Sequence, residues 1–415
     1  MSNRGLSTDS AARPVFSSFP YWFYTALCTV TLALSAFVGV ACVATSATDV
    51  GDRSAQLDKI FPRAAQFKLE QHPKHSAVLR IALLSSGDGS VTSAEWCGPR
   101  ILRFYFGYSD YIGDMKIPKE HGAYLMDIES RTVWRLRPLP GGGELVNCSI
   151  DGEWLIYART VGKDMIVGRY HLSTAKREDF AHFKDIRNSP NDSRLLTAGV
   201  WSPDGKKIAY GWKKIDLIKM SEPVWEVFRL RRDFSPGQLA DFRWLGDSTR
   251  VILRYFSKPL QKPNLAIDDS GDPNKPLQVL GPPKGFDGSP ELFSVLKPVD
   301  SSSLYGVAYY KDSSQHLQRC VISANDLHCR PAIDGDPKIT SAYDISPGDK
   351  NIYYQSQGPS PCVIRYDTIN RNKVCLWPET VLAMSLAPDG IRIAFISPRI
   401  GGNGESGIGV MRVDG

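Results

Sequence analysis

Apolar and polar residues alternate on both sides of a Pro-Asp-Gly turn, and this is the clearest pattern in the sequence. Residues 200–210 read Val-Trp-Ser-Pro-Asp-Gly-Lys-Lys-Ile-Ala-Tyr, with apolar residues returning at Ile208 and Tyr210. Proline presets φ at the first turn position, aspartate can hydrogen-bond the backbone ahead of it, and glycine takes the positive φ that closes the turn. The stretch therefore predicts a strand, a tight turn around Asp204 and Gly205, and a second strand.

Degenerate copies of this turn recur along the chain at intervals of 41 to 53 residues. In each copy an apolar residue follows the turn position by four residues, which sets the inward face of the second strand. The turn positions are Asp151, Asp204, Asp247, Asp300, Gly348 and Asp389, and Gly390 follows Asp389 as Gly205 follows Asp204. A weaker copy at residues 98–102 makes seven units. We interpret the turn aspartates as structural, with calcium binding as the alternative.

The spacing of the copies predicts the fold. A period of about 40 to 50 residues with about four short strands is typical of a β-propeller blade, because one four-stranded sheet cannot bury both of its faces alone. We predict an all-β, seven-bladed β-propeller over residues 76–415, with six or eight blades as alternatives and an elongated β-sandwich array as the competing architecture. Few residues follow Asp389, so we expect the strand at residues 76–85 to complete the last blade and close the ring.

The N-terminal part of the chain predicts a membrane segment. Residues 14–48 contain no charge, aromatic residues cluster near position 21, and Arg4 and Arg13 precede the apolar stretch. An apolar stretch of about 20 residues can span a bilayer, with the positively charged side staying in the cytoplasm. We expect a short cytoplasmic tail at 1–18, a transmembrane signal anchor at 19–47 and a linker at 48–75.

Two other interpretations of this segment remain open. Small residues at 44–47 would suit a cleaved signal peptide, although the apolar stretch is longer than the usual 7 to 15 residues. Residues 40–42 faintly resemble a lipoprotein cleavage box. In all three cases the rest of the chain is exported, and we expect it in the periplasm or outside the cell.

Three stretches resemble a known repeat. Residues 201–210, 386–395 and 410–415 look like the WD40-like propeller repeat of the TolB family, the periplasmic component of the Tol-Pal envelope system, and the repeat is also similar to the propeller of prolyl oligopeptidases. The resemblance covers roughly residues 90 to 415 and implies a propeller fold in a bacterial envelope. No separate α/β domain precedes the repeats, so the chain does not match a TolB orthologue and Pal binding is not carried over.

The composition of the chain limits the classes of partner that we expect. The chain has 415 residues, a formal net charge of +6, 35 glycines and 28 prolines. Lysine and arginine are interspersed with aspartate and glutamate and form no basic stripe, so we expect no nucleic-acid partner. The glycines and prolines imply many turns.

Six cysteines follow the apolar segment, and their placement suggests disulfides. Cys320 and Cys329 flank one predicted turn symmetrically, Cys362 and Cys375 flank another, and Cys97 and Cys148 stand near the same phase of adjacent units. Residues on opposed strands can approach within disulfide range. Three bridges would suit an oxidising compartment. Buried free thiols are the alternative for each pair.

No catalytic motif is apparent. The sequence has no Gly-x-Ser-x-Gly elbow and no room for a hydrolase domain beside the propeller. His72 and His75 have chelating spacing but no nearby partners, and we interpret them as solvated loop residues. We therefore assign no catalytic residue, cofactor or metal. Trp212 and Trp225, on predicted surface loops, are candidate binding aromatics.

These observations favour a membrane-anchored, exported propeller that acts as a non-catalytic protein-interaction scaffold, with an envelope or extracellular protein as partner. The alternatives are an enzyme with its site at the central channel and a glycan-binding protein that uses tryptophan side chains. The residues before the turns discriminate between them, because convergent His, Asp or Glu side chains there would indicate catalysis. These positions are mostly apolar or aromatic, which favours packing; they include Trp201, Phe242, Trp244, Phe293, Tyr343, Met384 and Leu386.

Overall fold

The structure of the protein is a computed structural model. The residues it describes are 49–83, 90–107, 122–136, 144–162, 164–183, 200–211, 215–220, 225–228, 238–256, 264–269, 275–285, 292–335, 337–398, 400 and 406–414. The predicted tail 1–18 and anchor 19–47 lie outside these residues, and no helix within them is long and apolar enough to cross a membrane. The chain divides into two compact units, Met1–Asp52 and Arg53–Gly415. The fold described below is that of the second unit.

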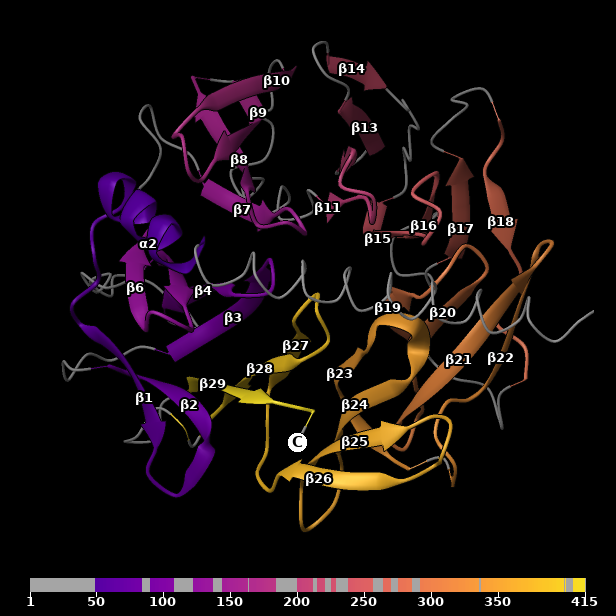
Figure 1. Ribbon diagram of the computed structural model, residues 1–415. Coiled ribbons are helices and arrows are strands. Elements are labelled where there is room, and N and C mark those ends of the chain that lie inside the picture. The colour runs from indigo at the N-terminus through magenta and orange to yellow at the C-terminus, as the bar shows by residue number, and fades with distance from the viewer. Residues whose placement is uncertain are drawn as a thin grey trace, which may run out of the picture. The chain divides into compact units, whose positions relative to one another are not determined.

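The second unit is an all-β propeller, as the repeats predict. Its described strands form seven antiparallel sheets, six with four strands and one with five (Figure 1). In chain order the four-stranded sheets are β3 to β6, β7 to β10, β11 to β14, β15 to β18, β19 to β22 and β23 to β26. The five-stranded sheet has the order β1-β2-β29-β28-β27. It joins the two ends of the propeller sequence.

The strand bounds follow the predicted spacing. The first three four-stranded sheets comprise β3 Ser90–Cys97, β4 Ile101–Gly107, β5 Gly122–Asp127, β6 Thr132–Arg135, β7 Glu144–Cys148, β8 Trp154–Val161, β9 Asp164–His171, β10 Arg177–Phe183, β11 Val200–Trp201, β12 Lys207–Gly211, β13 Ile215–Met220 and β14 Trp225–Phe228. The next three comprise β15 Gln238–Trp244, β16 Arg250–Phe256, β17 Asn264–Asp269, β18 Gln278–Leu280, β19 Leu292–Pro298, β20 Ser303–Tyr309, β21 Gln315–Ser323, β22 Asp326–Pro331, β23 Ile339–Ile345, β24 Asn351–Ser356, β25 Val363–Asp367 and β26 Lys373–Trp377. The last sheet contains β1 Phe67–His72, β2 His75–Leu83, β27 Ala383–Leu386, β28 Arg392–Ser397 and β29 Gly407–Arg412.

The first strand of each four-stranded sheet lies nearest the common centre, and later strands lie farther out (Figure 1). First strands of neighbouring sheets contact one another, as β27 contacts β3, β19 contacts β23 and β23 contacts β27. The first strands therefore surround the axis of the propeller, and their side chains are candidates for an axial site.

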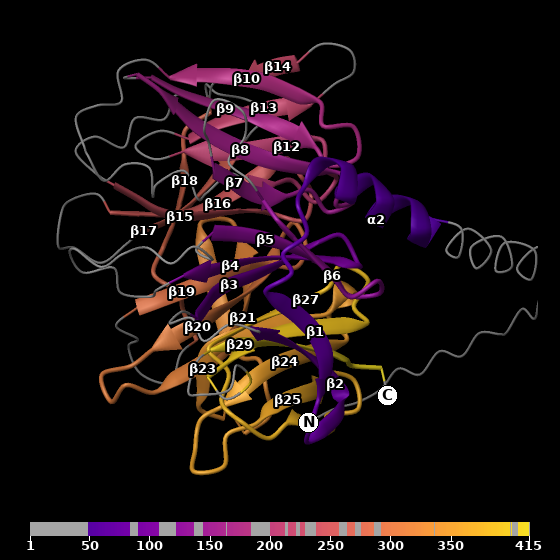
Figure 2. The same ribbon diagram turned by 90° about the vertical axis from the view of Figure 1, so that its left-hand side faces the viewer.

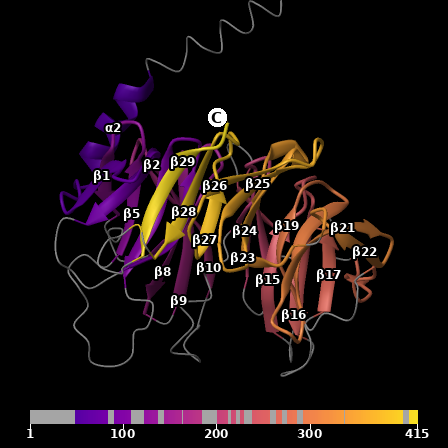
Figure 3. The same ribbon diagram turned by 90° about the horizontal axis from the view of Figure 1, so that it is seen from below.

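The N-terminal strands complete the last sheet. Within that sheet β2 pairs with β29, with Leu79 opposite Val410, and β1 pairs with the outer edge of β2. Figure 3 shows β29 and β28, in yellow, between β2 and the sheet that begins with β23. This is the position expected for a strand at residues 76–85 that closes the ring. The pairing covers an edge that would otherwise present unpaired backbone groups.

The prediction of a linker at residues 48–75 is wrong for the described residues. They contain the helix α2 (Asp49–Ile60) and the strand β1. Leu57 on the helix and Phe61 directly after it are 1% and 4% exposed, and the Phe61 N–H donates to the Leu57 carbonyl at 2.8 Å. The Trp134 indole donates a hydrogen bond to Asp58 at 2.9 Å. The helical pattern was missed because only one short apolar stripe marks it.

The chain after α2 also runs along the first four-stranded sheet. Ala64 donates a backbone hydrogen bond to Val133 at 2.8 Å, and Arg135 donates one to Pro62 at 3.0 Å. The next residues enter β1 and then β2, which belong to the last sheet. Figure 2 shows these indigo strands at the junction. One continuous segment thus fastens the first sheet to the last.

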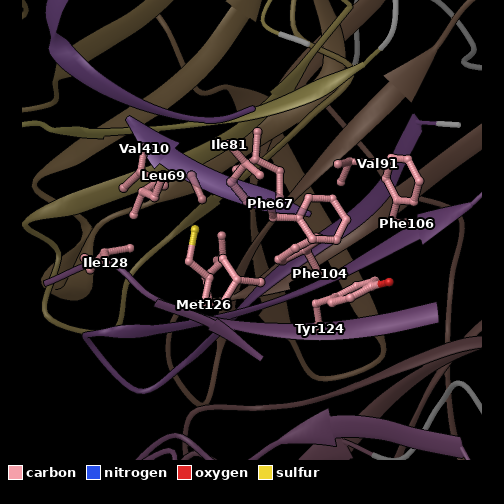
Figure 4. Close-up of a cluster of buried hydrophobic side chains, with 14 of the residues drawn as sticks. Phe67, Leu69, Ile81, Val91, Phe104, Phe106, Tyr124, Met126, Ile128 and Val410 are labelled. Atoms are coloured by element: carbon pink, nitrogen blue, oxygen red, sulfur yellow. The ribbon is translucent and has the colours of Figure 1, made fainter. Parts of the chain in front are cut away.

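An aromatic core fills this junction (Figure 4). Phe67 of β1 packs with its ring centroid 4.7 Å from that of Tyr124 and 5.5 Å from that of Phe104. Leu69 and Val410 lie in the same buried cluster. Buried aromatic pairs of this kind stabilise by roughly 0.5–1.5 kcal/mol beyond their area. The segment that looked like a linker is therefore part of the core.

The repeated turns have the geometry that the sequence predicts. Asp151, Asp204, Asp247, Asp300 and Asp389 each accept a hydrogen bond from the backbone N–H two residues later, at 2.7 to 3.0 Å. Gly205 and Gly390 follow with φ of 69° and 71°. This carboxylate bond stabilises each turn locally.

A basic residue three positions after the turn aspartate links neighbouring sheets. It donates a hydrogen bond to a backbone carbonyl in the turn of the adjacent sheet: Lys207 to Ser248 at 2.8 Å, Arg250 to Ser301 at 2.7 Å and Arg392 to Pro99 at 3.0 Å. The sheets are thereby held in register where the first strands end.

Candidate functional site

The first strands carry alternating apolar and charged residues. The apolar residues pack between sheets as predicted: Trp201, Phe242, Trp244, Phe293, Tyr343 and Leu386 are at most 9% exposed. Charged residues that the sequence analysis did not single out stand among or beside them. They are Glu95 on β3, Arg243 on β15, Lys297 on β19 and Asp344 on β23. We call these four residues and Arg103 on β4 the axial cluster.

Lys297 and Asp344 connect neighbouring first strands. The Lys297 ammonium lies 2.8 Å from the Asp344 carboxylate and donates to the Tyr343 carbonyl at 2.8 Å. The other Asp344 oxygen accepts a hydrogen bond from the backbone N–H of Leu386 on β27, also at 2.8 Å. The Asp344 carboxylate therefore ties β19, β23 and β27 together at the axis.

The next contact crosses from the last sheet to the first. The Trp96 indole on β3 donates a hydrogen bond to the Ser385 carbonyl on β27 at 2.8 Å. Four successive first strands, β19, β23, β27 and β3, are thus linked by side-chain hydrogen bonds. Such a continuous network holds charged groups in fixed positions.

Glu95 is the carboxylate next to this crossing. It forms an ion pair with Arg103 at 3.0 Å, and its side chain keeps 41% of its exposure. Burial raises the pKa of Glu95, and the positive charges of Arg103 and Arg243 only partly oppose that rise. The Glu95 carboxylate is therefore closely surrounded by protein atoms and still partly exposed.

Arg243 comes from a distant sheet but acts on the same group. Its positive charge lowers the pKa of Glu95, which lies three sheets away around the ring. It also opposes the rise that burial and the Asp344 charge cause in the pKa of Tyr343, two sheets away in the other direction. The Arg243 guanidinium donates a hydrogen bond to the Phe242 carbonyl at 2.7 Å.

The axial cluster joins three cations and two carboxylates from four sheets. Arginine binds carboxylate and phosphate groups in a bidentate manner, and a carboxyl group with a raised pKa can donate as well as accept a hydrogen bond. This set can orient a polar ligand with a negatively charged group. Within the described ranges, no group of three or more His, Cys, Asp or Glu side chains is arranged to hold a metal ion.

All three predicted disulfides are present. Cys97 and Cys148 join the ends of β3 and β7, the first strands of two sheets, with their Cα atoms 5.0 Å apart. The other two bridges close hairpins: Cys320–Cys329 across β21 and β22, with Cα atoms 4.0 Å apart, and Cys362–Cys375 beside β25 and β26, at 5.9 Å. Only the first bridge lies close to the axial cluster.

The structure describes the remaining candidate residues only in part. Trp212 lies outside the described residues, and Trp225 begins β14, where the side chain is not described. His72 and His75 are not solvated loop residues, since they end β1 and begin β2 and their rings contact Trp377. The prediction failed because the tryptophan comes from a strand 300 residues later.

The sequence matches no protein-family model and none of the curated proteins. Among solved structures it is similar to an oligogalacturonate lyase in complex with manganese, at 14% identity and a TM-score of 0.54, over 85% of this chain and 96% of that one. The oligogalacturonate lyase from Vibrio parahaemolyticus gives 14% identity and a TM-score of 0.52, over 84% and 96%. These similarities show a shared propeller fold. TolB from Acinetobacter baumannii, at 12% identity over 79% of each chain, has a TM-score of 0.38, too low to support a conclusion.

Proposed function

We propose that the protein is an exported propeller, anchored in a membrane by residues 19–47, that acts as a non-catalytic binding scaffold and receives its partner at the axial cluster. The observation that supports this most directly is that Glu95, Arg243, Lys297 and Asp344 stand on the first strands of four sheets, where those strands surround the axis. Fixed charges favour recognition, because their geometry is prepared before the ligand arrives.

The pairing of the charges favours binding over catalysis. The Asp344 carboxylate accepts hydrogen bonds from Lys297 and from the backbone N–H of Leu386. Its lone pairs are therefore used to hold the strands of the site together. We expect the partner to be an envelope or extracellular protein that presents an acidic side chain or chain terminus to Arg243. Seven blades closed by the N-terminal strands would give this partner a rigid surface.

Crosslinking in native membranes tests the proposal. The full-length protein should capture a defined partner, and Arg243→Ala should lose it, while Lys311→Ala, which removes an exposed cation on the β20–β21 turn, should keep it. If Arg243→Ala folds normally and still captures the same partner, the axial cluster is not the binding site. The anchor is tested separately by alkaline extraction, which should leave the protein in the membrane pellet.

Export is tested by the state of the cysteines. Protein isolated from its native membranes under rapid alkylation should show all six extramembrane cysteines blocked from the reagent until it is reduced. Alkylation of Cys97 and Cys148 without reduction would contradict location in an oxidising compartment.

A second candidate function is an enzyme with its site at the axis. Glu95 is the observation in its favour, since a carboxyl group with a raised pKa beside arginines is a candidate general acid. Two similar structures are oligogalacturonate lyases, one of them in complex with manganese. Incubation with acidic oligosaccharides, with and without manganese, followed by mass spectrometry would detect cleavage. Turnover that Glu95→Gln abolishes would establish the enzyme and displace the scaffold.

A further inference from the structure

The tip of the β1–β2 hairpin holds two histidines face to face. His72 and His75 are paired residues in the register of the hairpin, and their ring centroids are 5.1 Å apart. Both rings also lie against Trp377, the last residue of β26, at 5.4 and 4.6 Å. Trp377 is fully buried. The tip of the hairpin in the last sheet is thus docked on the neighbouring sheet through these three rings.

Hydrogen bonding selects the neutral form of His72. Its Nδ1 accepts a hydrogen bond from the backbone N–H of Lys74 at 3.3 Å, and an imidazolium has no lone pair with which to accept. Protonation at this nitrogen would therefore break the bond that shapes the tip. The ring of His75 lies 5.1 Å from that of His72.

The charged groups around His72 oppose its protonation. Burial is the main cause that lowers the pKa of His72, and the positive charges of His75, Arg80 and Lys74 lower it further. Glu379, which follows β26, is the acidic group that raises it. Glu70 forms an ion pair with Arg80 at 2.7 Å, which weakens the effect of the arginine charge on His72.

We propose that this contact is a proton-sensitive clasp: at neutral pH the hairpin tip is docked on Trp377, and in mildly acidic surroundings protonation of His72 releases it. The change is confined to the tip. Phe67 and Leu69 at the other end of β1 remain in the core, and β2 keeps its pairs with β29. The inference does not depend on the axial site.

Amide hydrogen exchange of the full-length protein in detergent tests the clasp. Rates at pH 7.5 and 5.5, corrected for intrinsic exchange, should show that the protection of residues 70–77 falls at the lower pH, because protonation of His72 is favoured once the tip is released. Protection of β28 should not change. The double variant His72→Gln/His75→Gln should lose this pH dependence, and His328→Gln, which removes an exposed histidine on β22, should keep it.

Histidine ring titration by NMR in the wild-type protein covers the case in which the double variant does not fold. The His72 ring signals should titrate below the ordinary range of histidine, because burial lowers its pKa, and the hairpin amide signals should shift over the same range. Wild-type protection that does not change between the two pH values, or a pH dependence that persists in the folded double variant, would overturn the proposal.

Discussion

Two glycines at the same position of the repeated turn provide the sharpest test of how the sheets pack. Gly152 and Gly205 both follow a turn aspartate, with φ of 71° and 69°. A Cβ on Gly205 would have no atom within 4 Å. A Cβ on Gly152 would overlap the carbonyl oxygen of Cys97 and lie 2.7 Å from its carbonyl carbon. Alanine at either position would therefore meet the same backbone strain, and the two positions differ only in the space available for the new Cβ.

The expected free energies follow from this difference. Alanine in the left-handed region costs about 1–2 kcal/mol, and this is the whole effect expected for Gly205→Ala. Gly152→Ala adds a steric term, because the atoms it meets are backbone and Cys97 is held by its disulfide to Cys148. Overpacking of this kind costs about 1–3 kcal/mol. We expect Gly152→Ala to lower the free energy of unfolding by about 2–5 kcal/mol in total.

Urea unfolding of the two variants, followed by tryptophan fluorescence, measures both losses under the same conditions. The difference between them is more reliable than either value, because their strain terms cancel. Equal losses, within about 0.5 kcal/mol, would show that the turn of β7–β8 does not press against the end of β3 and would refute the described contact.

Three further predictions concern charges and the disulfide. Asp344→Ala should lower the free energy of unfolding by about 2–3 kcal/mol, because it removes a charged hydrogen-bond acceptor and leaves the Lys297 ammonium without its carboxylate partner. Asp344→Asn should lower it less, and thermal unfolding compares the two variants. Burial alone would raise the pKa of Asp127, but hydrogen bonds from Arg100, Ser54 and the Glu129 amide lower it. The contribution of Asp127 to stability should therefore be complete above pH 3.8 and be lost as the pH falls below that value. Acid unfolding measures this loss, and Asp127→Asn should make stability less dependent on pH in that range. Replacing Cys97 and Cys148 by serine should cost up to about 4 kcal/mol, because the bridge closes a 51-residue separation, and unfolding without reductant measures it.

The local features of the fold could be predicted from the sequence, because short-range chemistry determines them. Proline, aspartate and glycine specify each turn, as at Asp204 and Gly205, and the repetition of that turn specifies a propeller. The hairpin disulfides followed from symmetric spacing about a turn. The seven units counted in the sequence correspond to seven sheets.

The axial cluster could not be predicted from the same patterns. In β15, Arg243 stands between two buried aromatic residues, and the alternation shows only that its side chain points away from theirs. Glu95 lies about 150 residues earlier in the chain and three sheets away. Their proximity arises only when the ring closes. Single-sequence patterns contain no information on which blades face each other across an axis.

Closure of the ring and the geometry of the axial cluster depend on each other. The bond from Trp96 to the Ser385 carbonyl crosses the junction between the first and last sheets, and Trp96 is adjacent to Glu95. The strand β27 that supplies Ser385 belongs to the sheet that β2 completes through β29. Loss of β2 would unpair β29, and the loosening would reach β27 and the Leu386 amide that holds Asp344 only through β28. Release of the hairpin tip alone leaves the β2–β29 pairs intact, so acidification should loosen the clasp without disturbing the axial charges.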